Sequence, residues 1–230
     1  MQNSDRAKNT EPAKKECVIL LHGLARSRYS LTKLASELSV DYAVLNDTYP
    51  SRKHTIEELA KIAVGGALAK CLDDYSKVHF VTHSLGGILV RQYLSQHNVA
   101  KLGHVVMLGP PNQGSELVDF FSKSPFLEGL FANINGPAGR QLSTASDSVP
   151  KLLGEVDFSL GVIAGTRNFN FIYSKIMPGK SDGKVTVESS KVLGMNDHIS
   201  LPVDHTFMMR DAKVIAQIKA FLQHGAFEHD

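Results

Sequence analysis

Tryptophan is absent from the sequence, cysteine occurs only twice, and neither sign of charge dominates. Two cysteines exclude a disulfide framework and a four-cysteine zinc site, and Cys17 and Cys71 each lie in an apolar stretch typical of buried thiols. A single bridge between them stays open. The formal net charge is only +2, which provides no basic field of the kind that nucleic-acid binding requires. We therefore expect no nucleic-acid partner.

Long apolar runs are also missing. The longest, Val18 to Leu21 and Ile62 to Ala69, fall well short of the roughly 20 residues of a membrane span, so no transmembrane segment is expected. Residues 1–16 are polar and mixed in charge and lack the apolar centre of a secretory signal, which predicts a flexible tail and a cytoplasmic protein. A leader removed before residue 1 stays open.

Hydrophobic residues nevertheless make up 43% of the 230 residues, enough for one continuous core. Short apolar segments alternate with segments of helical periodicity, which predicts an α/β fold: a mostly parallel sheet with helices on both faces. Thr55 followed by Glu58 indicates a capping box at a helix start. Expected strands are 17–21, 42–46, 78–82, 104–108, 160–164 and a weak one near 191–193; expected helices are 30–38, 55–72, 86–96 and 211–223. Residues 17–230 should form one domain, and residues 112–158 break the alternation like an insertion.

The segment Val78 to Gly87 joins an expected buried strand to an expected helix through Ser84. This context is typical of a nucleophile elbow, in which small residues two positions before and after the serine permit a sharp turn. Gly86 fits this pattern, whereas Thr82 stands where glycine is usual. The elbow would expose the Ser84 hydroxyl and offer the Leu85 N–H to a developing oxyanion. The alternative is an ordinary helix N-cap.

Four features in chain order resemble the α/β-hydrolase superfamily, above all its small lipases and esterases. They are His22-Gly23-Leu24, Ser84 within His-Ser-Leu-Gly-Gly, Asp182 within Asp-Gly-Lys-Val, and His205. The resemblance implies cleavage of carboxylic esters, with Ser84 as nucleophile, His205 as base and Asp182 as the orienting acid. It also implies that the Leu24 N–H is the second oxyanion donor.

Other residues compete for two of these roles. His198 is the main rival for the base, because it too lies late in the chain. Asp157, Asp197 and Asp204 are alternatives for the acid, and Asp182-Gly183 could be an ordinary turn. Side chains adjacent in an extended segment point apart, which disfavours Asp204 as the partner of His205 and Asp197 as the partner of His198.

The insertion bears on the substrate. Phe120, Phe121, Phe126 and Leu130 are candidates for an apolar wall or lid over Ser84 that suits an acyl group, and the alternative is a helix buried on the sheet. We expect a small-molecule ester with an apolar acyl group as substrate, while contact with a lipid surface and the oligomeric state stay open. The sequence contains no HExxH, paired CxxC, P-loop or GxGxxG motif, so neither a metal nor a cofactor is expected. Alternative functions are a thioesterase or acyltransferase using the same three residues, and a non-catalytic binding protein on the same scaffold.

Overall fold

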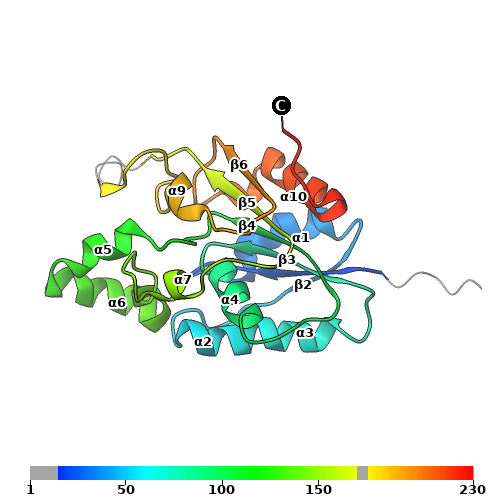
Figure 1. Ribbon diagram of the computed structural model, residues 1–230, viewed down its shortest axis with the longest axis horizontal. Helices are drawn as coiled ribbons and strands as arrows, with labels where there is room; N and C mark the ends of the chain where they lie inside the picture. Colours follow the sequence, from blue (N-terminus) through cyan, green and yellow to red (C-terminus); the bar gives the residue numbers. More distant parts are fainter. Residues whose placement is uncertain (1–14, 170–175, 230) are drawn as a thin grey trace, which may run out of the picture.

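The computed structural model describes residues 15–169 and 176–229, and its centre is a parallel sheet (Figure 1). Six strands in these ranges pair in the order β2-β1-β3-β4-β5-β6, and every pair is parallel. The strands are β1 Cys17–Leu21, β2 Ala43–Asn46, β3 Val78–His83, β4 Leu102–Leu108, β5 Leu160–Gly165 and β6 Asp197–Leu201. The predicted fold class is confirmed.

Helices cover both faces of the sheet because successive side chains of each strand point to opposite faces. In β1, Ile19 and Leu21 join one apolar cluster, and Val18 and Leu20 join the other. The first cluster includes side chains of α2, α3 and α4, and the second those of α1 and α10. The bounds are α1 Thr32–Leu38, α2 Ile56–Leu59, α3 Gly66–Cys71, α4 Leu85–Leu94, α5 Glu116–Ser122, α6 Pro125–Arg140, α7 Val149–Leu152, α9 Val187–Ser190 and α10 Ala212–His224.

Short irregular helices extend several of these elements. A 3₁₀ turn, Arg28–Leu31, precedes α1, and another, Met208–Arg210, precedes α10. The predicted helix over 55–72 begins at the expected capping box of Thr55 and Glu58. It is continuous but contains a π-helical segment, Ala60–Gly65, between α2 and α3.

One predicted strand is wrong. Residues 191–193 form no strand, and the edge strand β6 instead comprises Asp197–Leu201. Its register is set against β5, with Gly161 opposite Asp197. Because β6 pairs with one neighbour only and is half-buried, it tolerates polar residues and lacks the apolar run by which the central strands are recognised.

The predicted insertion contains α5, α6 and α7, which lie beyond the carboxyl ends of the strands together with α9 (Figure 1). Within α6, Gly136 has a φ of 68° and interrupts the helix at a kink before Pro137. A Cβ at Gly136 would lie 1.9 Å from the main-chain oxygen of Arg52, so only glycine fits. The kink therefore brings α6 against the loop before α2.

One hydrogen bond ties the insertion to α2, and another holds the insertion together internally. The N–H of Ile56 donates to Oε1 of Gln141 at 2.7 Å, directly after α6. The N–H of Thr144 donates to Oδ1 of Asp119 in α5 at 3.0 Å. The expected lid-like role of this segment remains a prediction.

The amino edge of the sheet holds the start of the described chain. The predicted tail falls largely on residues 1–14, outside the described residues, but Glu16 accepts a hydrogen bond from the N–H of Ala43. Cys17 and Cys71 form a disulfide with Cα atoms 6.3 Å apart. Such bridges are typical of proteins in oxidising compartments. The disulfide therefore disagrees with the expected cytoplasmic location.

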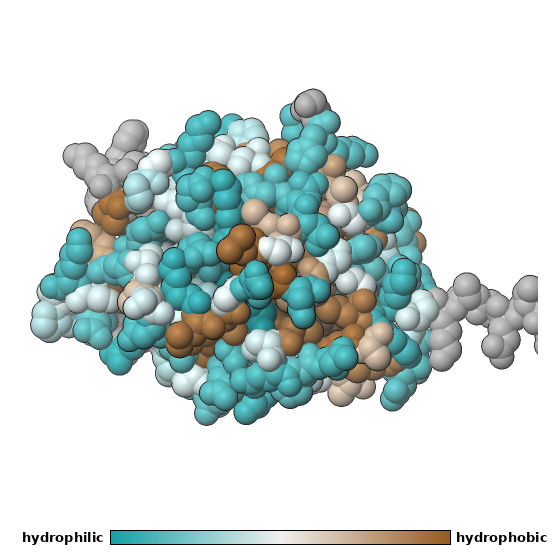
Figure 2. All heavy atoms as spheres, in the orientation of Figure 1, coloured by the Kyte–Doolittle hydropathy of each residue, from teal (hydrophilic) through white to brown (hydrophobic). Residues whose placement is uncertain are grey.

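The outer surface is mostly polar, as expected for a chain whose apolar side chains lie in its own core. The face in Figure 2 is largely hydrophilic, with separate apolar patches. Within the described residues, every helix is too short or too polar to span a lipid bilayer.

Candidate active site

Ser84 occupies a strained turn between β3 and α4. Its φ of 54° is one of two positive φ values outside glycine in the described residues, the other being that of Ala25. Such a conformation costs about 1 to 3 kcal/mol and persists where the surroundings enforce it. Here α4 begins so close to the end of the neighbouring strand β1 that a Cβ at Gly86 would lie 2.7 Å from the Leu21 carbonyl oxygen. This geometry is that of a nucleophile elbow.

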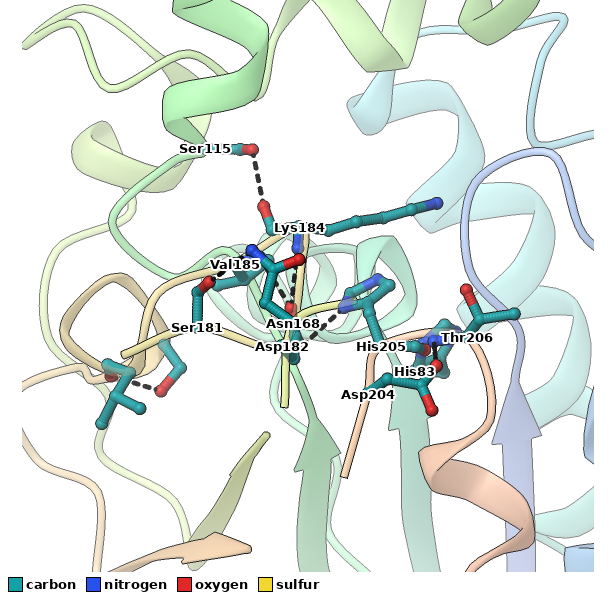
Figure 3. Close-up of polar contacts among 12 residues, drawn as sticks. His83, Ser115, Asn168, Ser181, Asp182, Lys184, Val185, Asp204, His205 and Thr206 are labelled. Atoms are coloured by element: carbon teal, nitrogen blue, oxygen red, sulfur yellow. Dashed lines mark hydrogen bonds and ion pairs between the residues drawn. The ribbon is translucent and has the colours of Figure 1, made fainter. Parts of the chain in front are cut away.

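Asp182 and His205 form a buried pair (Figure 3). Asp182 Oδ2 lies 2.7 Å from His205 Nδ1, and the main-chain N–H of His205 donates to the Asp182 carbonyl oxygen at 2.9 Å. Asp182 Oδ1 accepts hydrogen bonds from the N–H groups of Lys184 and Val185, at 2.9 and 2.8 Å. The carboxylate is therefore fixed by the backbone on one oxygen and orients the imidazole with the other.

Gly109, at the end of β4, makes room for this pair. A Cβ there would lie 2.8 Å from Asp182 Oδ2 and 3.0 Å from His205 Nδ1. Its φ of 52° also favours glycine. The pair thus sits directly over the carboxyl end of the sheet, where parallel α/β proteins place their ligand sites.

One cavity of about 340 Å³, here called the site cavity, brings the candidate residues together. Leu24, Ser84 and His205 all line it, and Asp182 lies behind His205. Leu85 is the first residue of α4, where a helix leaves its N–H groups without intrahelical partners. The lining also includes an apolar wall made of Leu117, Val118, Phe121, Phe131, Ile134 and Leu142.

The insertion supplies this wall, but not with all the predicted side chains. Phe121 lines the site cavity and stacks on Phe131, with ring centroids 5.2 Å apart. Phe120 packs edge-on against Phe121 outside the cavity lining, and the Phe126 side chain is 79% exposed. These two assignments are corrected. Leu130 belongs to α6, and its side chain lies outside the description.

The sequence analysis did not single out the other residues of this wall. Leu117, Val118 and Phe121 follow the i, i+1, i+4 spacing of one face of α5, which was a usable signal. Phe131 offered no such signal, because the phase of α6 depends on its start at Pro125 and on the kink at Gly136.

The rival residues lie elsewhere in the described structure. His198 is in β6, with Nε2 3.2 Å from Ser190 Oγ. Asp197 accepts from the N–H of Phe227, and Asp204 accepts from the N–H groups of Thr206 and Phe207. Asp157 lines a different cavity. None of these four residues lines the site cavity.

The loop that carries Leu24 is held by residues of the loop after β2. His22 stacks on Tyr49, with ring centroids 4.0 Å apart, and its Nε2 accepts the N–H of Tyr49 at 3.2 Å. Nδ1 of His22 then carries the proton and donates to the Gly23 carbonyl oxygen at 2.8 Å. The N–H of Ala25 donates to Ser51 Oγ at 3.1 Å. Both sides of Leu24 are therefore anchored.

The imidazoles of His22 and His83, next to the site, have lowered pKa values, which favours their neutral forms. Burial lowers the pKa of His22, with a smaller opposing effect from its bond to Gly23. Burial and then the neighbouring His205 hold the pKa of His83 well below its usual value. No group of three or more His, Cys, Asp or Glu side chains in the described ranges is arranged to hold a metal ion.

The sheet, the elbow at its carboxyl edge and the Asp182–His205 pair define the α/β-hydrolase fold, and solved structures agree. The mature form of lipase BlEst2 from Bacillus licheniformis matches with a TM-score of 0.69 and 21% identity, over 96% of this chain and 96% of that chain. Its propeptide form matches with a TM-score of 0.71 and 20% identity over 97% of this chain, which spans about half (52%) of that chain.

Esterase RhEst1 from a Rhodococcus species matches with a TM-score of 0.59 and 15% identity, over 91% of each chain. At these identities the likeness shows the fold. Comparison of the sequence with protein-family models gives no match, and comparison with curated proteins gives none either.

Proposed function

We propose that this protein is a serine hydrolase that cleaves carboxylic esters with an apolar acyl group. The observation that carries the proposal is the buried Asp182–His205 pair, at 2.7 Å, whose imidazole shares a cavity with Ser84 at the elbow. Two structural neighbours with this fold are a lipase and an esterase. The apolar wall supports an acyl rather than a polar group as the buried part of the ester.

The reaction would proceed by two acyl transfers. His205 removes the Ser84 proton as the oxygen attacks the ester carbonyl, while Asp182 holds the imidazole tautomer and stabilises the imidazolium. The N–H groups of Leu24 and Leu85 stabilise the oxyanion. His205 then protonates the leaving alcohol, and water activated by His205 releases the acid from Ser84.

The insertion has a specific task in this scheme. We propose that residues 112–158, as part of a single domain over 17–230, contribute the acyl-binding wall through α5 and α6. Each methylene buried against it is worth about 0.8 kcal/mol. Across p-nitrophenyl esters of increasing chain length, kcat/KM should therefore rise about fourfold per methylene until the site cavity is full.

A fluorophosphonate probe followed by peptide mapping tests the nucleophile. The label should attach to Ser84, and Ser84→Ala should abolish labelling and lower ester turnover by about 10⁴-fold or more. Ser115→Ala is the matched control, because Ser115 lines the same cavity yet lies on the Asp182 side, where its hydroxyl donates to the Lys184 carbonyl oxygen. It should retain the label.

The same assays separate the alternatives. Faster turnover of acyl-thioesters, or acyl transfer to an added alcohol in preference to water, would assign the chain to the thioesterase or acyltransferase class. An inert Ser84 in a folded protein would favour a binding protein and refute the hydrolase.

A further inference from the structure

Two cations stand at the mouth of the site cavity without an acidic partner. Arg26 and Lys184 line the cavity, and both are exposed. Among the described residues, no aspartate or glutamate lines it, and neither cation forms an ion pair. An apolar cavity with an uncompensated positive rim is suited to a substrate that is apolar at one end and anionic at the other.

The main chain of each cation is fixed at the site. The N–H of Lys184 donates to Asp182 Oδ1 at 2.9 Å, and its carbonyl oxygen accepts from Ser115 Oγ at 3.1 Å. Its side chain runs past the His205 ring (Figure 3), which lines the same cavity. Arg26 directly follows the strained Ala25, and its N–H donates to the Gly23 carbonyl oxygen. The cations therefore flank the catalytic edge.

Their mutual effect is repulsive. Desolvation lowers the pKa of Lys184 most, Arg26 lowers it further, and Asp182 opposes both. Asp182 is itself occupied by His205 and by two backbone N–H groups. An anion bound between the two cations would replace this repulsion by two attractive contacts.

A second, more polar cavity of about 440 Å³ continues from Arg26. Arg210, Tyr29 and Thr206 also line it, and no acidic residue of the described chain does. Thr206 directly follows His205, so this cavity adjoins the reacting edge, and none of the residues of the acyl wall lines it. It offers room for the alcohol part of an ester.

We propose that the physiological ester is anionic, with a phosphate on its alcohol part held by Arg26 and Lys184 while the acyl group lies on the apolar wall. This inference rests on the proposed function, since it assigns the substrate class of the same site. In the reaction, the bond between the acyl carbon and the alcohol oxygen breaks. Water supplies the hydroxyl of the released acid and the proton of the phosphate-bearing alcohol.

A matched pair of substrates tests the inference. The esters are a 1-acylglycerol and the corresponding 1-acylglycerol 3-phosphate, with the same acyl chain, short enough to remain monomeric. The wild-type protein should show a kcat/KM about tenfold or more higher for the phosphate ester. Because the contacts lie at an exposed rim, this preference should shrink as salt is added.

Variants identify the cations responsible. Arg26→Gln and Lys184→Gln should each reduce the ratio of kcat/KM, phosphate ester over neutral ester, by about three- to tenfold. Lys77→Gln is the matched control: Lys77 lies directly before β3, at the opposite edge of the sheet, and should leave the ratio unchanged. Inhibition by free glycerol 3-phosphate measures whether the headgroup alone is recognised. It should compete with the phosphate ester for the wild-type protein, and it should inhibit Lys184→Gln more weakly.

The outcomes separate the two proposals. Turnover of both esters with a ratio near one, unchanged in Arg26→Gln and Lys184→Gln, overturns the anionic substrate and leaves the hydrolase standing. Turnover of neither ester by a folded protein, with Ser84 unlabelled by the fluorophosphonate, overturns the hydrolase and this inference with it.

Discussion

His83 Nε2 donates a hydrogen bond to the main-chain carbonyl oxygen of His205 at 2.9 Å. The residue before the elbow serine therefore holds the loop of the proposed base, across 122 positions of the chain. The other ring nitrogen, Nδ1, is buried without a hydrogen-bond partner, and a Cβ at Gly23 would lie 2.8 Å from it. Strand β3, the Leu24 loop and the His205 loop thus meet at one imidazole.

Replacing His83 should impair turnover more than a loss of stability explains. His83→Ala removes the bond that fixes the His205 loop, and small misplacements of a catalytic group can cost about 100-fold in rate. We expect kcat to fall about 10- to 100-fold in protein shown to be folded by circular dichroism. His79→Ala is the control, since His79 is an equally buried histidine at the other end of β3. If both variants kept the wild-type kcat, His83 would have no positioning role.

Asp182→Asn should abolish activity without displacing the loop. The amide oxygen can still accept from the N–H groups of Lys184 and Val185, which turns the NH₂ group toward His205 Nδ1. The imidazole is then held in the tautomer that cannot accept the Ser84 proton, and kcat should fall about 10³- to 10⁴-fold.

Asp204→Asn is the control for this experiment, because Asp204 is adjacent to His205 in sequence but caps the N–H groups of Thr206 and Phe207. Steady-state kinetics should show a change of less than about threefold. If Asp204→Asn lowered kcat more than Asp182→Asn did, Asp204 would be the catalytic acid.

Two glycine substitutions should change stability in opposite directions. Gly86→Ala forces a Cβ to within 2.7 Å of the Leu21 carbonyl oxygen and should lower the free energy of unfolding by about 1 to 3 kcal/mol. Gly66→Ala, in α3, meets nothing within 4 Å and should raise it by about 0.4 to 1 kcal/mol. Urea denaturation measures both, and equal effects would show that the elbow is not sterically tight.

Stability should fall as the pH drops from about 7 to about 5. Burial is the largest cause lowering the pKa of five histidines: His22, His79, His83, His104 and His198. Below about pH 6.5 the unfolded chain binds protons that the folded chain does not, so stability is fully present above this pH and is lost below it. The contribution of His83 to this slope should grow as the pH falls and approach about 1.4 kcal/mol per pH unit near pH 5.

Urea unfolding of wild type and His83→Gln at several pH values measures this contribution. The variant should show a shallower dependence, whereas identical slopes would mean that His83 is protonated in the folded protein.

Sequence patterns predicted the central part of the fold because buried parallel strands read as short apolar runs. The elbow at Ser84 was predictable for the same reason, since its neighbours must be small and its flanking elements are strongly patterned. Asp182 and His205 were found by resemblance and chain order; their 2.7 Å contact depends on loops whose conformations no local pattern encodes.

The insertion and the sheet edge were less predictable. Whether Phe126 or Phe131 faces the site cavity depends on how α6 begins at Pro125 and kinks at Gly136. The polar strand β6 was missed because a half-buried edge places few constraints on side chains. The roles of Arg26 and Lys184 emerge only from three-dimensional proximity, since 158 positions separate them in the chain.

The attachment of the end of α6 to Ile56, together with the internal bond between α5 and Thr144, has a kinetic consequence. A wall already tied down when the ester arrives requires no oil–water boundary to uncover the reacting serine. The rate on a sparingly soluble ester should therefore increase smoothly with concentration, with no abrupt jump at the point where droplets or micelles form.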